Sequence, residues 1–156
     1  MQYDKSKTIQ QAFASADFET YTALRGRPYT LSGVIEHGRA LGRTVGMPTA
    51  NLRVDAGEPL PPSGVYATVT RLPKGKYMGL TNIGPKPSVD DSGRVTVETY
   101  LFDFAGDIYG ERCDLEIHFR IRGIRKFADL DAVRAQVERD IAAAREKLMH
   151  IYTEEG

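Results

Sequence analysis

A threonine and an asparagine two positions apart are the first side chains in this sequence that could bind a metal ion. They occur in the stretch Pro48-Thr49-Ala50-Asn51. In an extended chain Thr49 and Asn51 project to the same side, and the proline before them restricts the backbone. A hydroxyl and an amide carbonyl are hard oxygen ligands, which suit Mg²⁺ bound together with phosphates and water. The alternative is a turn in which both side chains bond to the backbone.

Three glycines precede this stretch at four-residue intervals and could form a phosphate-binding loop. Gly38, Gly42 and Gly46 would let the backbone approach a ligand closely and expose its N–H groups. Arg39 and Arg43 add positive charge. The usual phosphate-loop pattern, Gly-x4-Gly-Lys-Ser/Thr, is absent, so a glycine-rich hairpin end with exposed arginines is the alternative.

Glu98 lies in the middle of an apolar run, where it could serve as a general base. The run extends from Arg94 to Phe104, and alternation places Glu98 on the face that also carries Tyr100 and Phe102. A carboxylate is rarely buried without a partner or a function. Partial desolvation would raise the pKa of Glu98 toward the range useful for proton abstraction. An ion pair with an arginine, or a position at an exposed strand end, is the alternative.

The histidines and the single cysteine offer neither a metal cluster nor a disulfide. His37, His118 and His150 lie far apart in the sequence, without metal-ligand spacing, and one cysteine cannot form an internal disulfide. The run from Cys113 to Ile121 alternates strictly between apolar and polar residues. Its apolar face consists of Cys113, Leu115, Ile117, Phe119 and Ile121. We therefore expect Cys113 to be a buried small hydrophobe and His118 to face water.

The elements that must position these residues are mainly strands. Glycine and proline clusters separate five runs that we predict to be strands, namely Tyr29 to Glu36, Gly64 to Arg71, Lys76 to Ile83, Arg94 to Phe104 and Cys113 to Ile121. Pro73-Lys74-Gly75 predicts a hairpin turn between the second and third. Helical spacing predicts a helix over residues 129–149 with Asp129 as N-cap. It also predicts two short helices within residues 5–25, separated by a break with a new N-cap at Ser15 and Asp17. Five or six strands followed by one helix indicate an all-β fold, a small antiparallel barrel or sandwich.

The composition is that of an ordinary globular domain. The chain has 156 residues, of which 41% are hydrophobic and 27% charged, with a formal net charge of zero. The length favours one domain, and the charge balance removes the simplest argument for nucleic-acid binding. No apolar run approaches the roughly 18 residues needed to span a membrane, and the N-terminus has no apolar signal-peptide core. We expect a soluble protein of the cytoplasm without a nucleic-acid or membrane partner.

The order of these motifs resembles that of the riboflavin kinase (flavokinase) family over about residues 27–149. The resemblance is carried by Gly33-Val34, Gly38 to Arg43, Gly46 to Leu52, Gly64 to Ala67, Asn82 to Gly84, Val97-Glu98 followed by Phe102 to Phe104, Ile108 to Gly110, and Arg122 to Phe127. The family fold is a six-stranded antiparallel Greek-key barrel with a C-terminal helix. The family's reaction transfers the γ-phosphate of ATP to the 5′-hydroxyl of riboflavin, which gives FMN and ADP.

The resemblance implies a role for each residue that matches a family motif. Thr49 and Asn51 would hold Mg²⁺ and the nucleotide phosphates, and Glu98 would accept the proton of the ribityl hydroxyl. The residues implied at the ATP site are Gly38, Arg43, Thr49, Asn51 and Tyr109. Those implied in a loop that closes over the flavin are Arg122, Arg125 and Phe127. These roles are physically reasonable, because phosphoryl transfer mainly needs alignment and charge neutralisation and a carboxylate is the minimal activator of an alcohol.

The chain departs from the family pattern in the flavin loop and near its N-terminus. Bacterial members commonly have Arg-Pro-Glu-x-Lys-Phe, whereas this sequence has Arg122-Gly-Ile-Arg-Lys-Phe127, a more flexible and more positive loop. Residues 5–30, especially Leu24 to Tyr29, resemble the linker that precedes the kinase module of bifunctional bacterial enzymes, which also make FAD through an adenylyltransferase domain. We interpret residues 1–26 as a helical arm or linker remnant and residues 27–150 as the kinase barrel with its C-terminal helix. The nucleotide-binding element of the second domain is absent, which implies FMN synthesis without FAD synthesis.

Two other functions remain open at this stage. One is a non-catalytic flavin- or nucleotide-binding module of the same fold, and the other is a generic small-barrel binder. Thr49, Asn51 and Glu98 together favour an enzyme, since a pure binder needs no base. We expect the metal-bound triphosphate and Glu98 to meet at one alcohol inside the closed barrel. A position of Glu98 outside the barrel, or far from Thr49 and Asn51, would overturn this mechanism.

Overall fold

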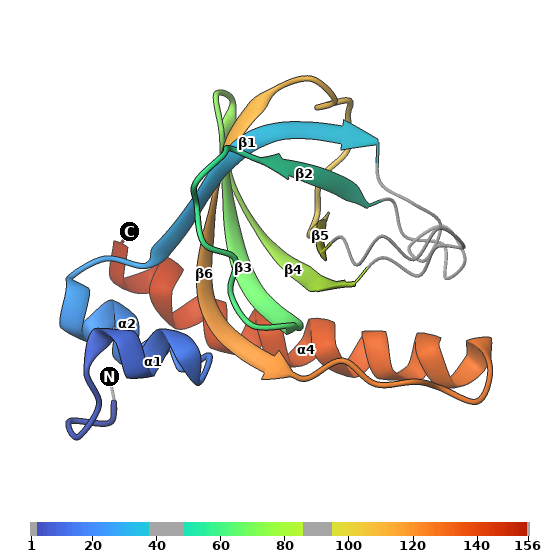
Figure 1. Cartoon of the computed structure of the whole chain (residues 1–156). Coiled ribbons are helices and arrows are strands. Elements are labelled where there is room, and N and C mark those ends of the chain that lie inside the picture. The colour runs from blue at the N-terminus through green and yellow to red at the C-terminus, as the bar shows by residue number, and fades with distance from the viewer. Residues whose placement is uncertain (1–2, 38–48, 86–94, 156) are drawn as a thin grey trace.

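Six strands formed by the described residues close into an antiparallel barrel (Figure 1). The computed structural model describes residues 3–37, 49–85 and 95–155. The strands are β1 (Tyr29–His37), β2 (Ala50–Val54), β3 (Gly64–Leu72), β4 (Gly75–Pro85), β5 (Val95–Leu101) and β6 (Arg112–Arg122). Their order around the barrel is β1-β2-β5-β4-β3-β6, and β6 pairs with β1 to close it. The all-β barrel predicted from the sequence is thereby confirmed.

Most strands lie where the sequence places them. Residues 73 and 74 form the turn of the β3–β4 hairpin, in which Leu72 pairs with Gly75 as predicted. The exception is β2, a strand of five residues that directly follows Thr49. Its run is too short, and too mixed in polarity, to stand out as a strand by periodicity alone. It supplies the partner of β1 on one side and of β5 on the other.

The barrel interior is filled by side chains from all six strands. Its apolar part includes Leu31, Ile35, Leu52, Tyr66, Ile83, Val97, Leu101, Leu115 and Ile117. A chain of three buried threonines completes it: the hydroxyl oxygens of Thr68 and Thr81 are 2.8 Å apart, and those of Thr81 and Thr99 are 2.9 Å apart. Alternate residues of each strand thus form a packed interior, and the remaining residues face outward.

The predicted alternation of β6 is wrong in its second half, because the strand contains β-bulges. Ile117 pairs with Thr68, and Phe119 pairs with Ala67, the neighbour of Thr68 on β3. His118 is therefore an extra residue between Ile117 and Phe119. An extra residue reverses the facing of all residues beyond it. Cys113 is buried as expected, at 6% exposure, but Phe119 lies on the outer face in the cluster under the C-terminal helix. His118 is only 6% exposed, which corrects the expectation that it faces water.

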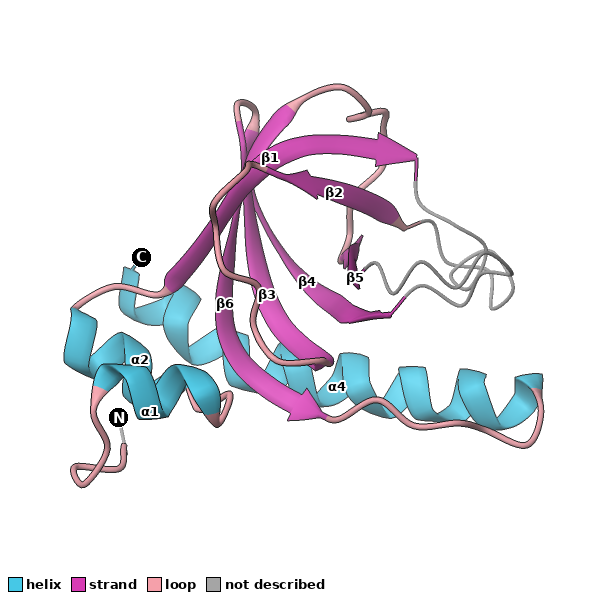
Figure 2. Ribbon diagram, viewed as in Figure 1, coloured by secondary structure: helices cyan, strands magenta, loops and turns pink. Residues whose placement is uncertain are grey.

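Helix α4 (Leu130–Glu155) covers the outer face of β3, β4 and β6 (Figure 2). It begins after Asp129, whose carboxylate accepts a hydrogen bond from the backbone N–H of Ala132 at 2.8 Å, as the N-cap prediction requires. Ala144 and Leu148 of α4 are fully buried on this face. None of the described helices is both long and apolar enough to cross a membrane.

Two short helices, α1 (Ile9–Ala14) and α2 (Phe18–Arg25), form the N-terminal arm predicted from the sequence. Asp17 caps α2 through its side chain, and Gly26 ends it in a left-handed conformation with φ 87°. Phe18 is 1% exposed and stands edge-on to Tyr66 of the barrel, with ring centroids 5.6 Å apart. The arm therefore shares its core with the barrel. Whether the chain divides functionally after residue 26 stays a prediction.

Candidate active site

Glu98 lies on the outer face of the barrel, which corrects the expectation that it would face the interior. Its neighbours Val97 and Thr99 are buried in the interior, at 2% and 3% exposure, whereas Glu98 is half-buried on the opposite side of β5. Alternation in the sequence shows which residues share a face, but not which face is enclosed. Because the interior is packed, a ligand must approach Glu98 from outside.

The strand register brings Glu98 next to Asn51, as the predicted chemistry requires. Glu98 pairs with Asn51 of β2 on one side and with Asn82 of β4 on the other. Directly opposed residues on one face have their Cβ atoms about 5 Å apart. Two outcomes would overturn the mechanism as predicted, with Glu98 inside the barrel. The first is found, because Glu98 lies on the outer face, so the predicted location of the site is wrong. The second is not found, because Glu98 is adjacent to Asn51. The site belongs on the outer face.

This pairing is part of a row of residues that runs across the outer face of the whole barrel. From β1 to β6 the successive partners are Glu36, Asn51, Glu98, Asn82, Val65 and Arg122. Arg122 is three strands from Glu98, which is about 14 Å along the sheet. The row therefore joins the predicted metal ligand, the predicted base and the first residue of the predicted flavin loop at one level of the barrel.

Asn51 has an oxygen that suits a cation. Its Oδ1 is buried and accepts no hydrogen bond from the residues that the structure describes. A buried carbonyl oxygen without a partner is costly, and a divalent cation or a substrate donor would satisfy it. The described residues contain no group of three or more His, Cys, Asp or Glu side chains that could hold a metal by themselves. The donor set thus fits an ion held largely by phosphates and water.

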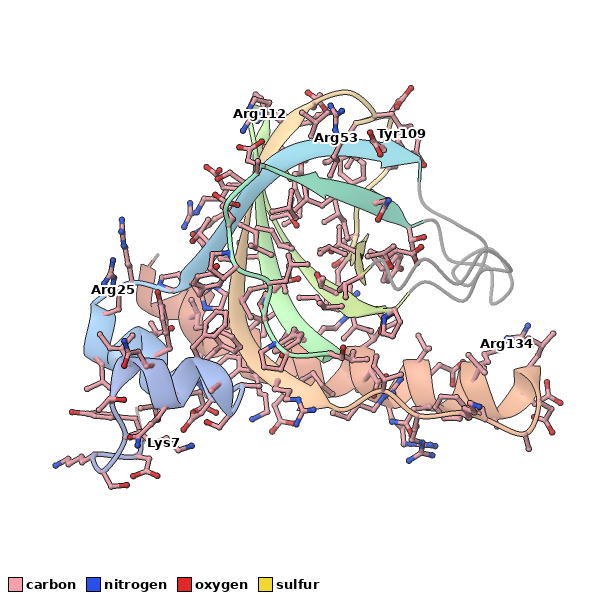
Figure 3. The ribbon with its side chains drawn as sticks, in the orientation of Figure 1. Lys7, Arg25, Arg53, Tyr109, Arg112 and Arg134 are labelled. Carbon is pink, nitrogen blue, oxygen red and sulfur yellow. The ribbon has the colours of Figure 1, made fainter. Side chains whose placement is uncertain are left out.

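Thr49 and Tyr109, both predicted at the ATP site, line one pocket of about 320 Å³. The pocket also includes Thr99, Leu101 and Phe104. Tyr109 is 37% exposed and lies near the end of β1, where the backbone N–H of Gly110 donates to the carbonyl of Ile35 at 2.7 Å (Figure 3). An exposed ring beside an apolar hollow is suited to stack on a flat heterocycle.

The loop after β6 is organised around Arg122 and Phe127. The guanidinium carbon of Arg122 lies 5.4 Å from the centre of the Phe127 ring, and that of Arg125 lies 4.8 Å from it. A Cβ added to Gly84 would be 3.4 Å from side-chain carbons of Ile124. Gly84 of β4 pairs with Thr96 of β5, two residues before Glu98. The loop therefore extends from the end of β6 to the vicinity of Glu98.

Comparison with known proteins agrees with this geometry. The family profile for riboflavin kinases matches residues 25–148 of the chain. The chain belongs to the riboflavin kinase family. A relative, the bifunctional riboflavin kinase/FMN adenylyltransferase of Pseudomonas fluorescens, is 36% identical over 140 residues, which is 90% of this chain but 45% of that protein. The chain thus spans about half the length of the curated relatives it matches.

Two solved structures resemble the chain in fold. A riboflavin kinase from Trypanosoma brucei aligns with a TM-score of 0.59 at 26% identity, covering 82% of this chain and 81% of that one. A macrolide-efflux protein from Streptococcus pneumoniae aligns with a TM-score of 0.81 at 32% identity, covering 91% of this chain and 48% of that one.

The predicted site residues of this riboflavin kinase family member fall into three groups. Glu98 and Asn51 meet on the outer face, Thr49 and Tyr109 share a pocket, and the third group forms the loop cluster: Arg122, Arg125 and Phe127. Gly38 and Arg43 lie outside the described residues.

Two residues of the site were not identified from the sequence. Asn82 belongs to the Asn82-Ile-Gly84 motif, but only the strand register shows that it flanks Glu98. Asp140 binds Arg122 from α4. A signal for Asp140 does exist, because it lies three residues after Val137 and four before Ala144, on the apolar stripe of the helix.

Proposed function

We propose that this chain is a riboflavin kinase, which transfers the γ-phosphate of ATP to the 5′-hydroxyl of riboflavin and releases FMN and ADP. Family membership supports this reaction class. The observation that carries the proposal is the cross-strand pairing of Glu98 with Asn51, whose buried Oδ1 is available to a cation. A base for the alcohol and an oxygen for the metal are thus adjacent on one surface.

In this proposal the chain's own residues align the reactants and move one proton. Glu98 accepts the proton of the 5′-hydroxyl as the new oxygen–phosphorus bond forms, and the bond from the γ-phosphorus to the bridging oxygen of ADP breaks. Thr49 and Asn51 are the residues that would hold Mg²⁺. When bound, Mg²⁺ supplies neutralisation of the charge on the phosphates. Tyr109 provides an exposed ring for the base of the nucleotide.

The flavin is assigned to the opposite part of the row. Arg122, Arg125 and Phe127 offer an aromatic ring and two cations, and Ile124 brings the same loop against Gly84. A flat, largely apolar ring system that carries polar edges is matched by contacts of this kind. Riboflavin placed between this loop and Glu98 would direct its ribityl chain toward the base.

The proposal is tested with the Glu98→Gln variant, with riboflavin and Mg·ATP as substrates. The amide keeps the size of the side chain but cannot accept the proton, so FMN formation should fall by about 10²–10⁴-fold, while riboflavin still binds. Chromatography of the products measures FMN formation, and flavin fluorescence measures riboflavin binding. Asp114→Asn is the matched control, because Asp114 is an exposed carboxylate on β6, and it should leave the rate unchanged.

Two outcomes would contradict the proposal in different ways. Near-normal FMN formation by the Glu98→Gln variant would remove Glu98 as the base. Riboflavin binding by the parent chain without any FMN formation would favour the non-catalytic binding module instead.

A further inference from the structure

A buried acid on α4 lies behind the flavin loop and belongs to none of the predicted site residues. Asp140 is 1% exposed. Its two carboxylate oxygens accept hydrogen bonds from Nε of Arg122 at 2.9 and 3.1 Å, and Oδ1 also accepts one from Nε2 of Gln136 at 2.8 Å. A carboxylate this deeply buried is stable only when it is paired and hydrogen-bonded. Asp140 therefore fixes the orientation of the Arg122 guanidinium.

Arg122 transmits this orientation to the loop. Its Nη1 donates to the carbonyl of Gly123 at 3.1 Å, and its guanidinium lies over the ring of Phe127. The side chain of Arg122 is 19% exposed, so the charge is largely removed from water. The path of residues 123–129 is therefore held by this anchored arginine and by the contact between Ile124 and Gly84.

The strand register shows why the orientation of Arg122 matters for riboflavin. Arg122 occupies the same row as Glu98, with Asn82 and Val65 between them. A shift of the guanidinium would move Phe127 and the loop relative to Glu98. It would not move Thr49 or Tyr109, which line a pocket that includes no residue of this loop.

We propose that Asp140 is a positioning residue for the flavin, acting through Arg122 to hold loop 123–129 at the distance from Glu98 that riboflavin requires. This inference rests on the proposed function. It predicts an effect on riboflavin and none on ATP, because loop 123–129 contributes no residue to the pocket of Thr49 and Tyr109.

The experiment compares Asp140→Asn with Asp103→Asn. The second variant is a matched control, since Asp103 forms the other described Asp–Arg pair between α4 and the barrel, with Arg145 at 2.9 Å, and is exposed. Asp140→Asn should raise the riboflavin KM, and the riboflavin Kd from fluorescence, about tenfold, with the ATP KM unchanged. Asp103→Asn should change neither constant. Equal increases in the KM of both substrates, or a lower Tm with an unchanged riboflavin Kd, would show a merely structural role.

A double-mutant cycle tests whether Asp140 acts through Arg122. In an Arg122→Gln background, Asp140→Asn should change the riboflavin Kd by less than about twofold, because the coupled partner is gone. A full tenfold effect in that background would overturn the inference. Should Asp140→Asn fail to fold, Gln136→Ala removes the hydrogen bond that orients Asp140, together with an exposed one from Arg139, and should raise the riboflavin Kd selectively; no change would reject the proposal. Absence of FMN formation by the parent chain would reject the proposed function, whereas parental activity with no effect at Asp140 rejects only this inference.

Discussion

Two carboxylates on the outer face of the barrel, Glu98 and Glu116, have different surroundings and therefore different uses. Glu116 is 8% exposed and binds two basic side chains, Nε of Arg71 at 2.6 Å and Nε2 of His118 at 3.0 Å. Burial alone would raise the pKa of Glu116, but the hydrogen bonds from His118 and Arg71 outweigh it and lower the pKa below its ordinary value of 4.5. Glu98 has two asparagines as its cross-strand neighbours. These contacts give Glu116 a structural role, whereas the role of Glu98 as a base stays a proposal.

The lowered pKa of Glu116 predicts how stability depends on pH. The stabilisation is complete above the ordinary pKa of 4.5 and is lost as pH falls through the lowered value of the folded state. Glu116→Gln should therefore cost about 2 kcal/mol of unfolding free energy at pH 7, and the difference from the parent should narrow in acid. Urea unfolding at neutral and acidic pH measures this. A difference that stays constant down to pH values below 4.5 would contradict it.

Thr49 should affect the nucleotide rather than the flavin. The Thr49→Ala variant loses one oxygen at the edge of the Tyr109 pocket, so the KM for Mg·ATP should rise about tenfold while riboflavin binding is unchanged. Thr30→Ala is the control, because the Thr30 hydroxyl donates to the carbonyl of Pro28 in the first part of β1. Equal weakening of both substrates would argue against a place for Thr49 at the metal.

At the scale of the elements, the site depends on close approach between strands. Where β4 passes β5, a Cβ at Gly79 would be 2.6 Å from the carbonyl oxygen of Tyr100. This is closer than a carbon can approach an oxygen, so glycine is required for the two strands to pair. That pairing, continued along β4, places Asn82 beside Glu98.

Gly79→Ala should therefore destabilise the barrel by about 1–3 kcal/mol, the usual cost of overpacking. Gly84→Ala, on the same strand, should cost less, because its Cβ would meet only side-chain carbons of Ile124 at 3.4 Å. Thermal or chemical unfolding compares the two variants. If Gly84→Ala proved the more damaging, the close contact at Gly79 would not limit strand pairing.

At the scale of the whole molecule, the N-terminal arm and the barrel form one structure. Phe18 of α2 contacts the rings of Phe13, Tyr29 and Tyr66, and it belongs to the same core as the barrel interior. Helix α2 of the arm lies against β6 and β1. We therefore expect the arm to contribute to the stability of the barrel.

Phe18→Ala should lower the unfolding free energy by about 3–5 kcal/mol, as for other buried aromatic residues. Leu24→Ala on the same helix is the control, because Leu24 is 39% exposed and should change stability by less than about 0.5 kcal/mol. A calorimetric scan of each variant measures the effect. An unchanged Tm for Phe18→Ala would mean that the arm folds independently of the barrel.

Local patterns in the sequence were sufficient to predict most of the helices and strands. Strand alternation, the turn before Gly75 and the caps at Asp17 and Asp129 depend on neighbouring residues only, so they can be recognised without a fold. The proximity of Asn51 to Glu98 agrees with the family motif, although the strand that carries Asn51 was not predicted as one.

Only the tertiary structure decided on which side of the barrel the site lies. Both faces of β5 carry apolar residues, because the interior takes one face and part of the other packs near α4, so alternation could not distinguish them. The bulge at His118 likewise depends on the pairing of β6 with β3, and the ion pair of Asp140 with Arg122 depends on the packing of α4 against the barrel. Such partners are chosen by packing and register, and no local pattern records them.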